Sequence, residues 1–321
     1  MPRIRLSTKL ALDCHWQSQP QGETLRLSVT NRKSSGILFC LLALSWAATA
    51  LARSATHVDV LEPKPGIPER DRDSLTGSQF AQHISRMSAQ QREDAIQREI
   101  EKGNVPNFLR KFVPVQLHSA SATRKNVTVT VFVAPDYLAI GSDADFLRIP
   151  MNLHTALAIA DRFGLVLPTK KMVDAIYLQS RYHLVPQPLP AGPQMTSTAY
   201  YQTHNRMIEM QADSLGVKLG DLVAGDKKDV VITNLLSRRM GKIAIYGWHR
   251  GPAHPIQPLS TVHGANYADY SHGIRLVSGT ALIDGKPRSI YDILRDPSAA
   301  SIVSDEGSIR AIDELFSPHR Q

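Results

Sequence analysis

Apolar residues recur at helical spacing from about residue 80 onward. Phe80, Ile84 and Met87 lie on one face of a helix, because three or four positions separate each from the next. Ser88 followed by Gln91 matches the capping box that begins a second helix. The pattern therefore predicts two consecutive amphipathic helices in this part of the chain.

Three further helices are predicted by polar caps and apolar stripes. Asn152 is suited to cap a helix over Leu153–Phe163, which Gly164 ends. Thr169 is suited to cap another helix, and a third is expected over Ala199–Ala212. Each of these helices has one apolar face, which we expect to pack against the rest of the domain.

The hydrophobic period changes to two at residues 127–133. Four valines alternate there with threonine and phenylalanine, which predicts a strand with one buried face. Asp284-Gly285 is a dipeptide typical of a hairpin turn. Other short strands are expected at 137–140, 230–233, 243–248 and 274–278. We therefore predict an α+β fold, a single compact domain with a small, mainly antiparallel sheet and several short helices.

The N-terminal region has the order of a secretory signal peptide. A basic segment at 31–33 precedes an apolar run at 36–46, and Ala50-Leu51-Ala52 matches the A-x-A cleavage pattern. We interpret 29–52 as the signal peptide rather than a membrane anchor, because the 17 residues of 36–52 are short for a span. Residues 1–28 resemble neither a signal nor a folded unit. We therefore expect translation to start at Val29, which makes 1–28 a wrongly assigned upstream extension.

Export determines the compartment and the partners that we expect. The protein should be periplasmic or secreted, with no stable membrane span after signal cleavage. Both cysteines, Cys14 and Cys40, lie in the removed part, so the mature chain has no disulfide and no thiolate nucleophile. Residues 53–321 contain 31 Lys and Arg against 27 Asp and Glu, a net charge of +4. This charge is too mild for nucleic-acid binding and is compatible with an anionic envelope or extracellular polymer as partner.

Residues 53–77 differ in composition from the chain that follows. They contain Pro63, Pro65, Gly66 and Pro68, followed by a charged run at 69–73. We predict an extended arm or linker there, which leaves 78–321 as the α+β domain.

Histidines are concentrated in the segment 249–272. Four of the 12 histidines lie in this window, where about one is expected: His249, His254, His263 and His272. The segment also contains Asp269, Ser271 and several glycines, and strands are predicted on both sides of it. Because binding sites are often built on loops that a rigid scaffold holds, we take this segment as the candidate site.

Zinc is the cofactor that this segment suggests. His249, His263, Asp269 and His272 supply imidazole and carboxylate ligands that would leave a position open for water. There is no H-E-x-x-H motif. The spacing of His263 and Asp269 resembles the His…Asp pair of some murein-cleaving zinc peptidases, although those enzymes place their Trp-His element downstream and Trp248-His249 lies upstream here.

Ser271 offers a second chemistry, as a nucleophile with a histidine base and Asp269 as the orienting carboxylate, although no G-x-S-x-G elbow surrounds it.

A third interpretation comes from a resemblance. His263-Gly264 followed by the run from Ser271 to Arg275 (Ser-His-Gly-Ile-Arg) resembles the His-Gly…Ser-His-Gly-Cys-x-Arg signature of the L,D-transpeptidases. Ile274 occupies the position of that family's catalytic cysteine, so transpeptidase activity is not implied.

Other polar residues have simpler interpretations. His204 lies among apolar residues of a helix and is expected to be a packed core histidine. Lys227-Lys228-Asp229 is expected to be a charged turn before a strand. Asp143 and Asp145 are expected in a turn. Arg275 in an apolar segment is expected either to bind an anion or to be the buried partner of Asp269.

The leading hypothesis is an exported hydrolase that acts on an envelope or extracellular polymer. The strands that end near Trp248 and begin near Ile274 are expected to bring His249 and His272 together. The predicted catalytic residues are His249, His263, Asp269, Ser271 and His272, and the predicted substrate-binding residues are Trp248 and Arg275. The alternative is a non-catalytic envelope protein, a binding or structural protein in which the same loop is a hydrogen-bonded network.

Overall fold

A computed structural model describes residues 65–119, 127–310, 312 and 315, which all belong to one unit of the chain. The predicted upstream extension at 1–28, the signal peptide at 29–52 and the first part of the arm at 53–64 lie outside the described residues. Residues 65–76 form no helix or strand, yet Ile67 is buried. Arg70 donates from Nε to Oδ1 of Asn104 (2.9 Å), which fastens this segment to the unit.

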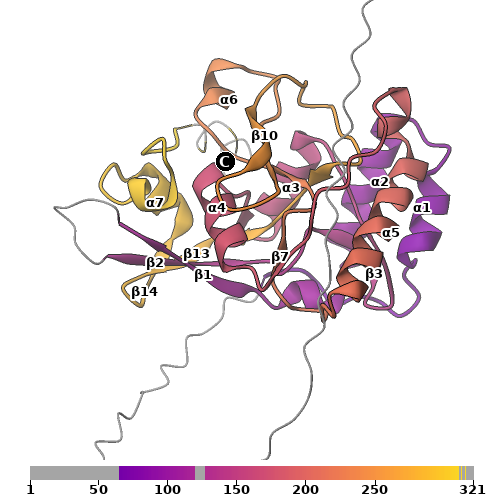
Figure 1. Cartoon of the computed structure of the whole chain (residues 1–321), viewed down its shortest axis with the longest axis horizontal. Coiled ribbons are helices and arrows are strands. Elements are labelled where there is room, and N and C mark those ends of the chain that lie inside the picture. The colour runs from indigo at the N-terminus through magenta and orange to yellow at the C-terminus, as the bar shows by residue number, and fades with distance from the viewer. Residues whose placement is uncertain (1–64, 120–126, 311, 313–314, 316–321) are drawn as a thin grey trace, which may run out of the picture. The chain divides into compact units, whose positions relative to one another are not determined.

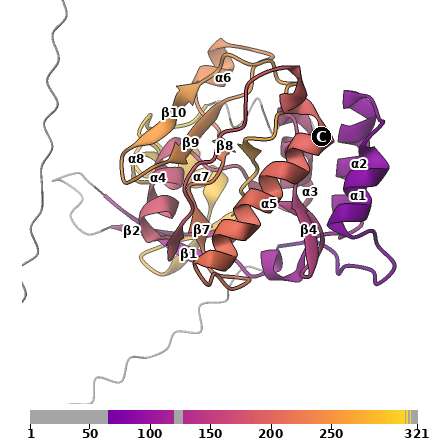
Figure 2. The same cartoon turned by 45° about the vertical axis from the view of Figure 1, so that its right-hand side comes forward.

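The polar caps begin the helices as the sequence predicts. Thr76 and Ser88 each form a capping box with a glutamine three residues later, and begin α1 (Gly77–Ile84) and α2 (Ala89–Glu101). Three later helices begin after a side chain that accepts a backbone N–H of the first turn: α3 (Leu153–Arg162) after Asn152, α4 (Lys170–Gln179) after Thr169 and α5 (Thr198–Ser214) after Ser197. Figures 1 and 2 show α1, α2 and α5 together on one side of the unit.

A six-stranded antiparallel sheet forms around β2. Its strands are β1 (Val113–His118), β2 (Thr128–Val133), β5 (Leu165–Val166), β12 (Val277–Ser278), β13 (Thr280–Ile283) and β14 (Lys286–Ser289). One edge of β2 pairs with β1 along its whole length, and the other edge pairs with β13 and then with β12. Asp284 and Gly285 connect β13 to β14, both with positive φ (48° and 81°), as the predicted hairpin turn requires.

A second sheet of four strands contains both ends of the histidine-rich segment. Its order is β10-β9-β8-β11, and its strands are β8 (Lys228–Val230), β9 (Ile245–His249), β10 (Pro255–Ser260) and β11 (His272–Gly273). β9 pairs antiparallel with both β8 and β10, whereas β11 pairs parallel with β8. The strand β8 therefore lies between the two ends of the segment 249–272.

Shorter elements complete the unit. β3 (Ala139–Ser142) and β4 (Asp145–Arg148) form a hairpin, and β6 (Tyr182–His183) pairs parallel with β7 (Val223–Ala224). The remaining helices are η1 (Asn107–Arg110), η2 (Pro193–Thr196), α6 (Leu235–Arg238), α7 (Ile290–Arg295) and α8 (Ala300–Val303).

One large hydrophobic cluster joins both sheets to the helices around them. It includes Phe80 of α1, Val131 of β2, Ile176 of α4 and Ile245 of β9, each of them buried. The predicted fold class is confirmed: the unit is a compact α+β fold whose sheets are mainly antiparallel. Among the described residues, none of the helices combines the length and the apolar character that crossing a bilayer requires.

Candidate functional site

A tight turn at the start of β11 gathers three of the predicted site residues. The carboxylate of Asp269 accepts hydrogen bonds at Oδ1 from the backbone N–H of Ser271 (2.8 Å) and from its hydroxyl (2.5 Å). The backbone N–H of His272 donates to the carbonyl of Asp269 (3.0 Å). Such local side-chain bonds are what Asp and Ser contribute to turns. The turn places His272 opposite Lys228 in the β8–β11 ladder.

Asp269 and His272 form a buried pair, which we call the Asp269–His272 pair. Nε2 of His272 lies 4.0 Å from Oδ2 of Asp269, and the two side chains are at most 1 % exposed. Burial lowers the pKa of His272 to about 4, although the charge of Asp269 opposes this shift. Burial would raise the pKa of Asp269, but His272 and the hydrogen bonds from Ser271 lower it overall. At neutral pH the pair is therefore a neutral imidazole beside a carboxylate.

Ser271 is not arranged as the sequence hypothesis expected. Its hydroxyl donates to Asp269 rather than to a histidine, so the carboxylate lies between the serine and His272. A serine nucleophile needs a histidine base within hydrogen-bond reach, with the carboxylate behind the histidine. The three residues meet, but not as a Ser-His-Asp relay.

His263 and Tyr267 cover the Asp269–His272 pair. Their rings stack with centroids 4.3 Å apart, and they lie 6.3 and 5.7 Å respectively from the ring of His272. The hydroxyl of Tyr267 donates to Oδ2 of Asp269 (3.0 Å). Both rings are only half-buried. These two rings therefore separate the pair from the surface, and we call them the His263–Tyr267 cover.

His249 lies elsewhere, and the expected meeting of His249 with His272 does not occur. The strand β8 intervenes between β9 and β11, so the two strand ends are not neighbours. The ring of His249 stacks on Tyr177 (4.7 Å), and its Nε2 donates to Oδ1 of Asp174 (3.1 Å). A Cβ added to Gly247 would lie 3.5 Å from Nδ1 of His249, which shows that this nitrogen faces the backbone of β9.

A cavity of about 500 Å³ lies against His249. Its polar residues include Lys170, Asp174 and Tyr246, and prolines and leucines supply much of the remaining wall. Tyr246 and Lys170 both bond to the carboxylate of Asp174, at 2.7 and 3.1 Å. Burial would raise the pKa of Asp174, but the hydrogen bonds from His249, Tyr246 and Lys170 lower it overall. Histidines of the histidine-rich segment thus lie at two separate places in the fold, with His249 at this cavity and His263 and His272 at the Asp269–His272 pair.

The predicted zinc ligands do not come together. His249 bonds to Asp174 on the far side of β8, whereas His263, Asp269 and His272 lie on the other side. In the part of the chain that the structure describes, no group of three or more His, Cys, Asp or Glu side chains has the arrangement to hold a metal ion. The four-ligand set expected from the sequence is therefore not formed.

Arg275 is neither an exposed anion-binding group nor the partner of Asp269. It is 1 % exposed and donates to the carbonyls of Ala134 and Val223, at 2.8 Å each. Its Nε lies 3.8 Å from Asp229, which is its carboxylate partner. The physical reason is that this arginine satisfies buried carbonyls inside the core, away from any surface that a polymer could reach.

The expected charged turn at 227–229 is also wrong. Lys227 and Asp229 are buried at 2 and 3 % exposure, because Lys228–Val230 is an inner strand, β8, of the four-stranded sheet. Burial lowers the pKa of Lys227 to about 8 and raises that of Asp229 to about 6. The sequence shows only that these residues precede a strand, and the buried pairing on both sides of β8 has no local signal.

Trp248 and His204 both lie near the start of β8, beside Lys228 and Lys227 respectively. Nζ of Lys228 lies 4.9 Å from the ring of Trp248, and the ring of His204 lies 6.4 Å from that of Trp248. His204 is fully buried, which confirms the expected core histidine. Trp248 is 6 % exposed, so it presents little surface to a substrate in this conformation.

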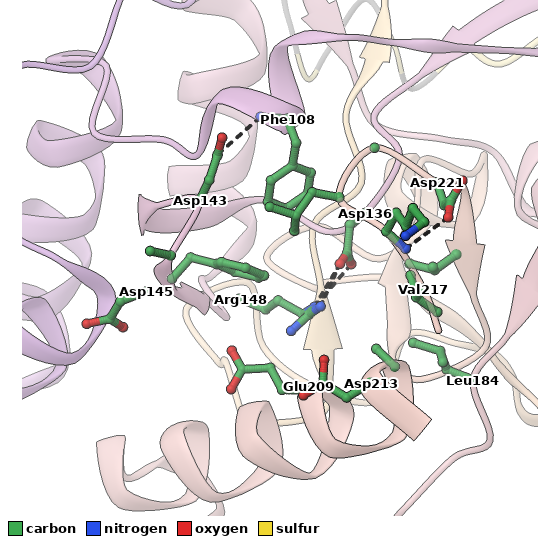
Figure 3. Close-up of a pocket in the computed structure, with 17 residues that line it drawn as sticks. Phe108, Asp136, Asp143, Asp145, Arg148, Leu184, Glu209, Asp213, Val217 and Asp221 are labelled. Carbon is green, nitrogen blue, oxygen red and sulfur yellow. Dashed lines mark hydrogen bonds and ion pairs between the residues drawn. The ribbon is translucent and has the colours of Figure 1, made fainter. Parts of the chain in front are cut away.

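A further cavity, of about 460 Å³, is lined by none of the site residues that we predicted from the sequence. Figure 3 shows it between the β3–β4 hairpin, α5 and the loop before β7. In its wall, Arg148 forms hydrogen bonds from Nε and Nη2 to the carboxylate of Asp136. Asp143 and Asp145 lie at the hairpin turn, as expected, and accept backbone N–H groups of Phe108 and Ser78. Twelve positions separate Asp136 from Arg148, so no motif marks this pair.

Comparison of the chain with protein-family models, with curated proteins and with solved structures finds no match in any of the three.

Proposed function

We propose that the protein is a hydrolase of an envelope or extracellular polymer and that His272 is its general base. The observation that carries this proposal is the Asp269–His272 pair. The imidazole is neutral, and neither of its nitrogens has a hydrogen-bond partner among the described residues. A carboxylate lies 4.0 Å away. Burial makes His272 a weak base in the described conformation, and exposure to water would remove this cause of its low pKa. The neutral imidazole could then accept a proton beside a carboxylate, as a general base does.

The proposed reaction uses only groups of this chain and water. A nitrogen of His272 takes a proton from the attacking water while the water oxygen bonds to the electrophilic carbon of the polymer linkage. The imidazolium then returns the proton to the leaving group as that bond breaks, so charge and protons balance. Asp269 stabilises the imidazolium in between, as the carboxylate does in other acid–base sites.

Access to His272 requires movement of the His263–Tyr267 cover. His272 is 0 % exposed, so water and polymer do not reach it in the described conformation. The cover belongs to a segment with little regular structure, in which Val262 and Asn266 are exposed. Segments of this kind open at low free energy and often serve as lids.

The signal-peptide pattern at 29–52 is the basis for the polymer class and for a periplasmic or secreted location. The mild positive charge of residues 53–321 is compatible with an anionic envelope polymer as the substrate. A second candidate function is a non-catalytic envelope protein. The full burial of Asp269, Ser271 and His272 favours it, because a buried hydrogen-bonded turn also stabilises a fold without any reaction.

A substitution of His272 tests the proposal. We expect the purified chain to release soluble fragments from isolated cell-wall sacculi or from an extracellular polysaccharide. His272→Gln should lower the release rate about 100-fold or more, because a general base contributes at least this factor. His254→Gln is the matched control, since His254 is exposed in the same segment.

Thermal unfolding of the same variants separates the two candidate functions. A hydrolase is expected to keep its melting temperature in His272→Gln while losing its activity. If His272→Gln unfolds, His272 is structural. If it cleaves as fast as the unsubstituted chain, His272 is not the general base and the proposal fails. Absence of cleavage of every polymer by the unsubstituted chain would equally refute the proposal.

A further inference from the structure

Trp248 and His204 each have a buried ring nitrogen without a hydrogen-bond partner among the described residues. These atoms are Nε1 of Trp248 and Nε2 of His204. Trp248 is 6 % exposed and His204 is fully buried. The two ring centroids lie 6.4 Å apart, and both rings contact Tyr270. Folded proteins leave few buried polar atoms unpaired, so each such atom needs an explanation.

Both nitrogens are hydrogen-bond donors. The indole N–H of Trp248 can only donate. Nδ1 of His204 lies 3.3 Å from Nζ of Lys227, and an ammonium group can only donate, so Nδ1 accepts and the ring hydrogen is on Nε2. Burial, with Lys227 and Arg148 nearby, lowers the pKa of His204 to about 2, which keeps the ring neutral. The missing partner is therefore an acceptor.

Two lysines lie near these donors. Nζ of Lys228 lies over the ring of Trp248, 4.9 Å from its centroid, and Nζ of Lys227 lies 3.3 Å from Nδ1 of His204. Asp269 also acts on Lys228, but its oxygens already accept hydrogen bonds from Ser271 and Tyr267. Two lysines beside two N–H donors favour an anionic acceptor over a neutral one, because hydrogen bonds to an ionised group are stronger.

The backbone holds Trp248 in an unusual conformation. Its φ is 56°, in the left-handed region that a bulky side chain rarely adopts. Its N–H donates to the carbonyl of Lys227 (3.0 Å), which fixes the residue against β8. Strained backbone of this kind is found most often at binding and catalytic sites, where it orients a side chain for a ligand.

We propose that Trp248, His204 and Lys228 form a binding site for a carboxylate group of a ligand. Two hydrogen bonds of about 2.9 Å to one acceptor require donor nitrogens within about 6 Å of each other. The centroids of the two rings are 6.4 Å apart. The site lies beside the proposed general base, because Lys228 pairs with His272 across the β8–β11 ladder. This identification of the substrate rests on the proposed function. If the protein is a hydrolase, its polymer is an acidic one that carries carboxylates.

Acetate binding tests this site without requiring any reaction. The full chain, labelled with ¹⁵N at its three tryptophans, is titrated with sodium acetate at constant ionic strength while the indole N–H resonances are recorded. The Trp248→Phe chain identifies the Trp248 signal. We expect that signal to shift downfield and to saturate, because its hydrogen bond to a carboxylate deshields the proton. Acetamide, a neutral acceptor, should bind more weakly.

Variants decide whether the lysine belongs to the site. Lys228→Met should weaken acetate binding about tenfold, because a charge-assisted contact is lost. Lys111→Met, an exposed lysine, should bind as the unsubstituted chain does. No saturable shift, the same shift with sodium chloride alone, or unchanged binding in Lys228→Met would overturn the proposal and leave water as the partner of both donors.

The result of the acetate titration can be distinguished from the result of the polymer-cleavage test. His272→Gln should still bind acetate, since His272 is not one of the three site residues. Acetate binding without cleavage of any polymer would refute the hydrolase but not the carboxylate site. Polymer cleavage without acetate binding would refute the carboxylate site but not the hydrolase.

Discussion

Arg148 and Asp136 are an ion pair in which both partners are buried. Their side chains are 4 and 7 % exposed, and Nη2 of Arg148 lies 2.7 Å from Oδ2 of Asp136. Burial would raise the pKa of Asp136, but Arg148 lowers it overall. The carboxylate is therefore ionised at neutral pH. Arg148 is its ion-pair partner, and the backbone N–H of Tyr137 also donates to its Oδ1 (2.6 Å).

Removing the arginine should destabilise the fold strongly. Arg148→Met leaves the Asp136 carboxylate buried without its partner, which costs about 3–5 kcal/mol of the free energy of unfolding. Urea denaturation measures the loss, and the exposed Arg206→Met provides the control, with an expected change within about 0.5 kcal/mol. The double variant Asp136→Asn with Arg148→Met should lose less than Arg148→Met alone. A loss below about 1 kcal/mol in Arg148→Met would contradict this account.

Single residues show where sequence reasoning reaches its limit. The burial of His204 was predictable, because it lies on the apolar face of a helix. The partner of Arg275 was not, because Asp229 is 46 positions away and becomes its neighbour only when β8 and β11 pair. Gly273 has a structural reason that the sequence does not show, because a Cβ there would lie 2.5 Å from the ring of Tyr137.

At the scale of elements, the N-terminal caps are the strongest local signals in the chain. Ser88 accepts the N–H of Gln91, and the side chain of Gln91 accepts the N–H of Ser88 (2.9 Å) at the start of α2. This helix has few apolar residues, and those buried include Ala95, Ile96 and Ile100. Its stability should therefore depend on its first turn as well as on packing.

Ser88→Ala should lower the free energy of unfolding by about 1 kcal/mol, because one backbone N–H of the first turn loses its acceptor. Chemical denaturation of the purified chain measures this change. Ser214→Ala is the matched control, since its hydroxyl bonds only to a carbonyl of its own helix on an exposed surface (2.7 Å). An equal effect of both substitutions would show that the capping box does not stabilise the fold.

Helices were predicted better than strands for a physical reason. A helix is specified by residues three and four positions apart and by its own caps, whereas a strand depends on a partner that is distant in sequence. The alternating valines of β2 were sufficient to predict that strand. In contrast, β1, with its Pro114, and the polar β14 carry no comparable pattern. The separation of His249 from His272 was not predicted for the same reason. The strand β8 lies between their two strands, and this strand order is a property of the topology.

At the scale of the whole molecule, buried carboxylates determine how stability depends on pH. Burial and the nearby charge of Asp136 raise the pKa of Asp226 to about 6. Neither oxygen of Asp226 has a hydrogen-bond partner among the residues that the structure places. An unfolded aspartate has a pKa of about 3.9. Between about pH 4 and 6 the folded chain therefore keeps a proton at Asp226 that the unfolded chain has lost.

The sign of the effect follows from this difference in bound protons. Stability falls with rising pH wherever the folded state binds more protons, so Asp226 destabilises the fold progressively from about pH 4 to 6 and fully above pH 6. Two pKa units correspond to about 3 kcal/mol as an upper limit. Asp226→Asn removes this ionisation. The variant should therefore be more stable than the unsubstituted chain at pH 7 and have no such advantage at pH 4.

Urea unfolding at both pH values measures the difference between the two chains. The comparison cancels the other groups that titrate in this range, notably His272 and Asp229, because both chains contain them. Asp213→Asn, an exposed position on α5, should stay within about 0.5 kcal/mol of the unsubstituted chain at either pH. If the stability difference of Asp226→Asn is the same at pH 4 and pH 7, Asp226 does not titrate between them. The interior around β8 would then hold it as a carboxylate throughout, compensated by Arg148, Lys227 and Arg275.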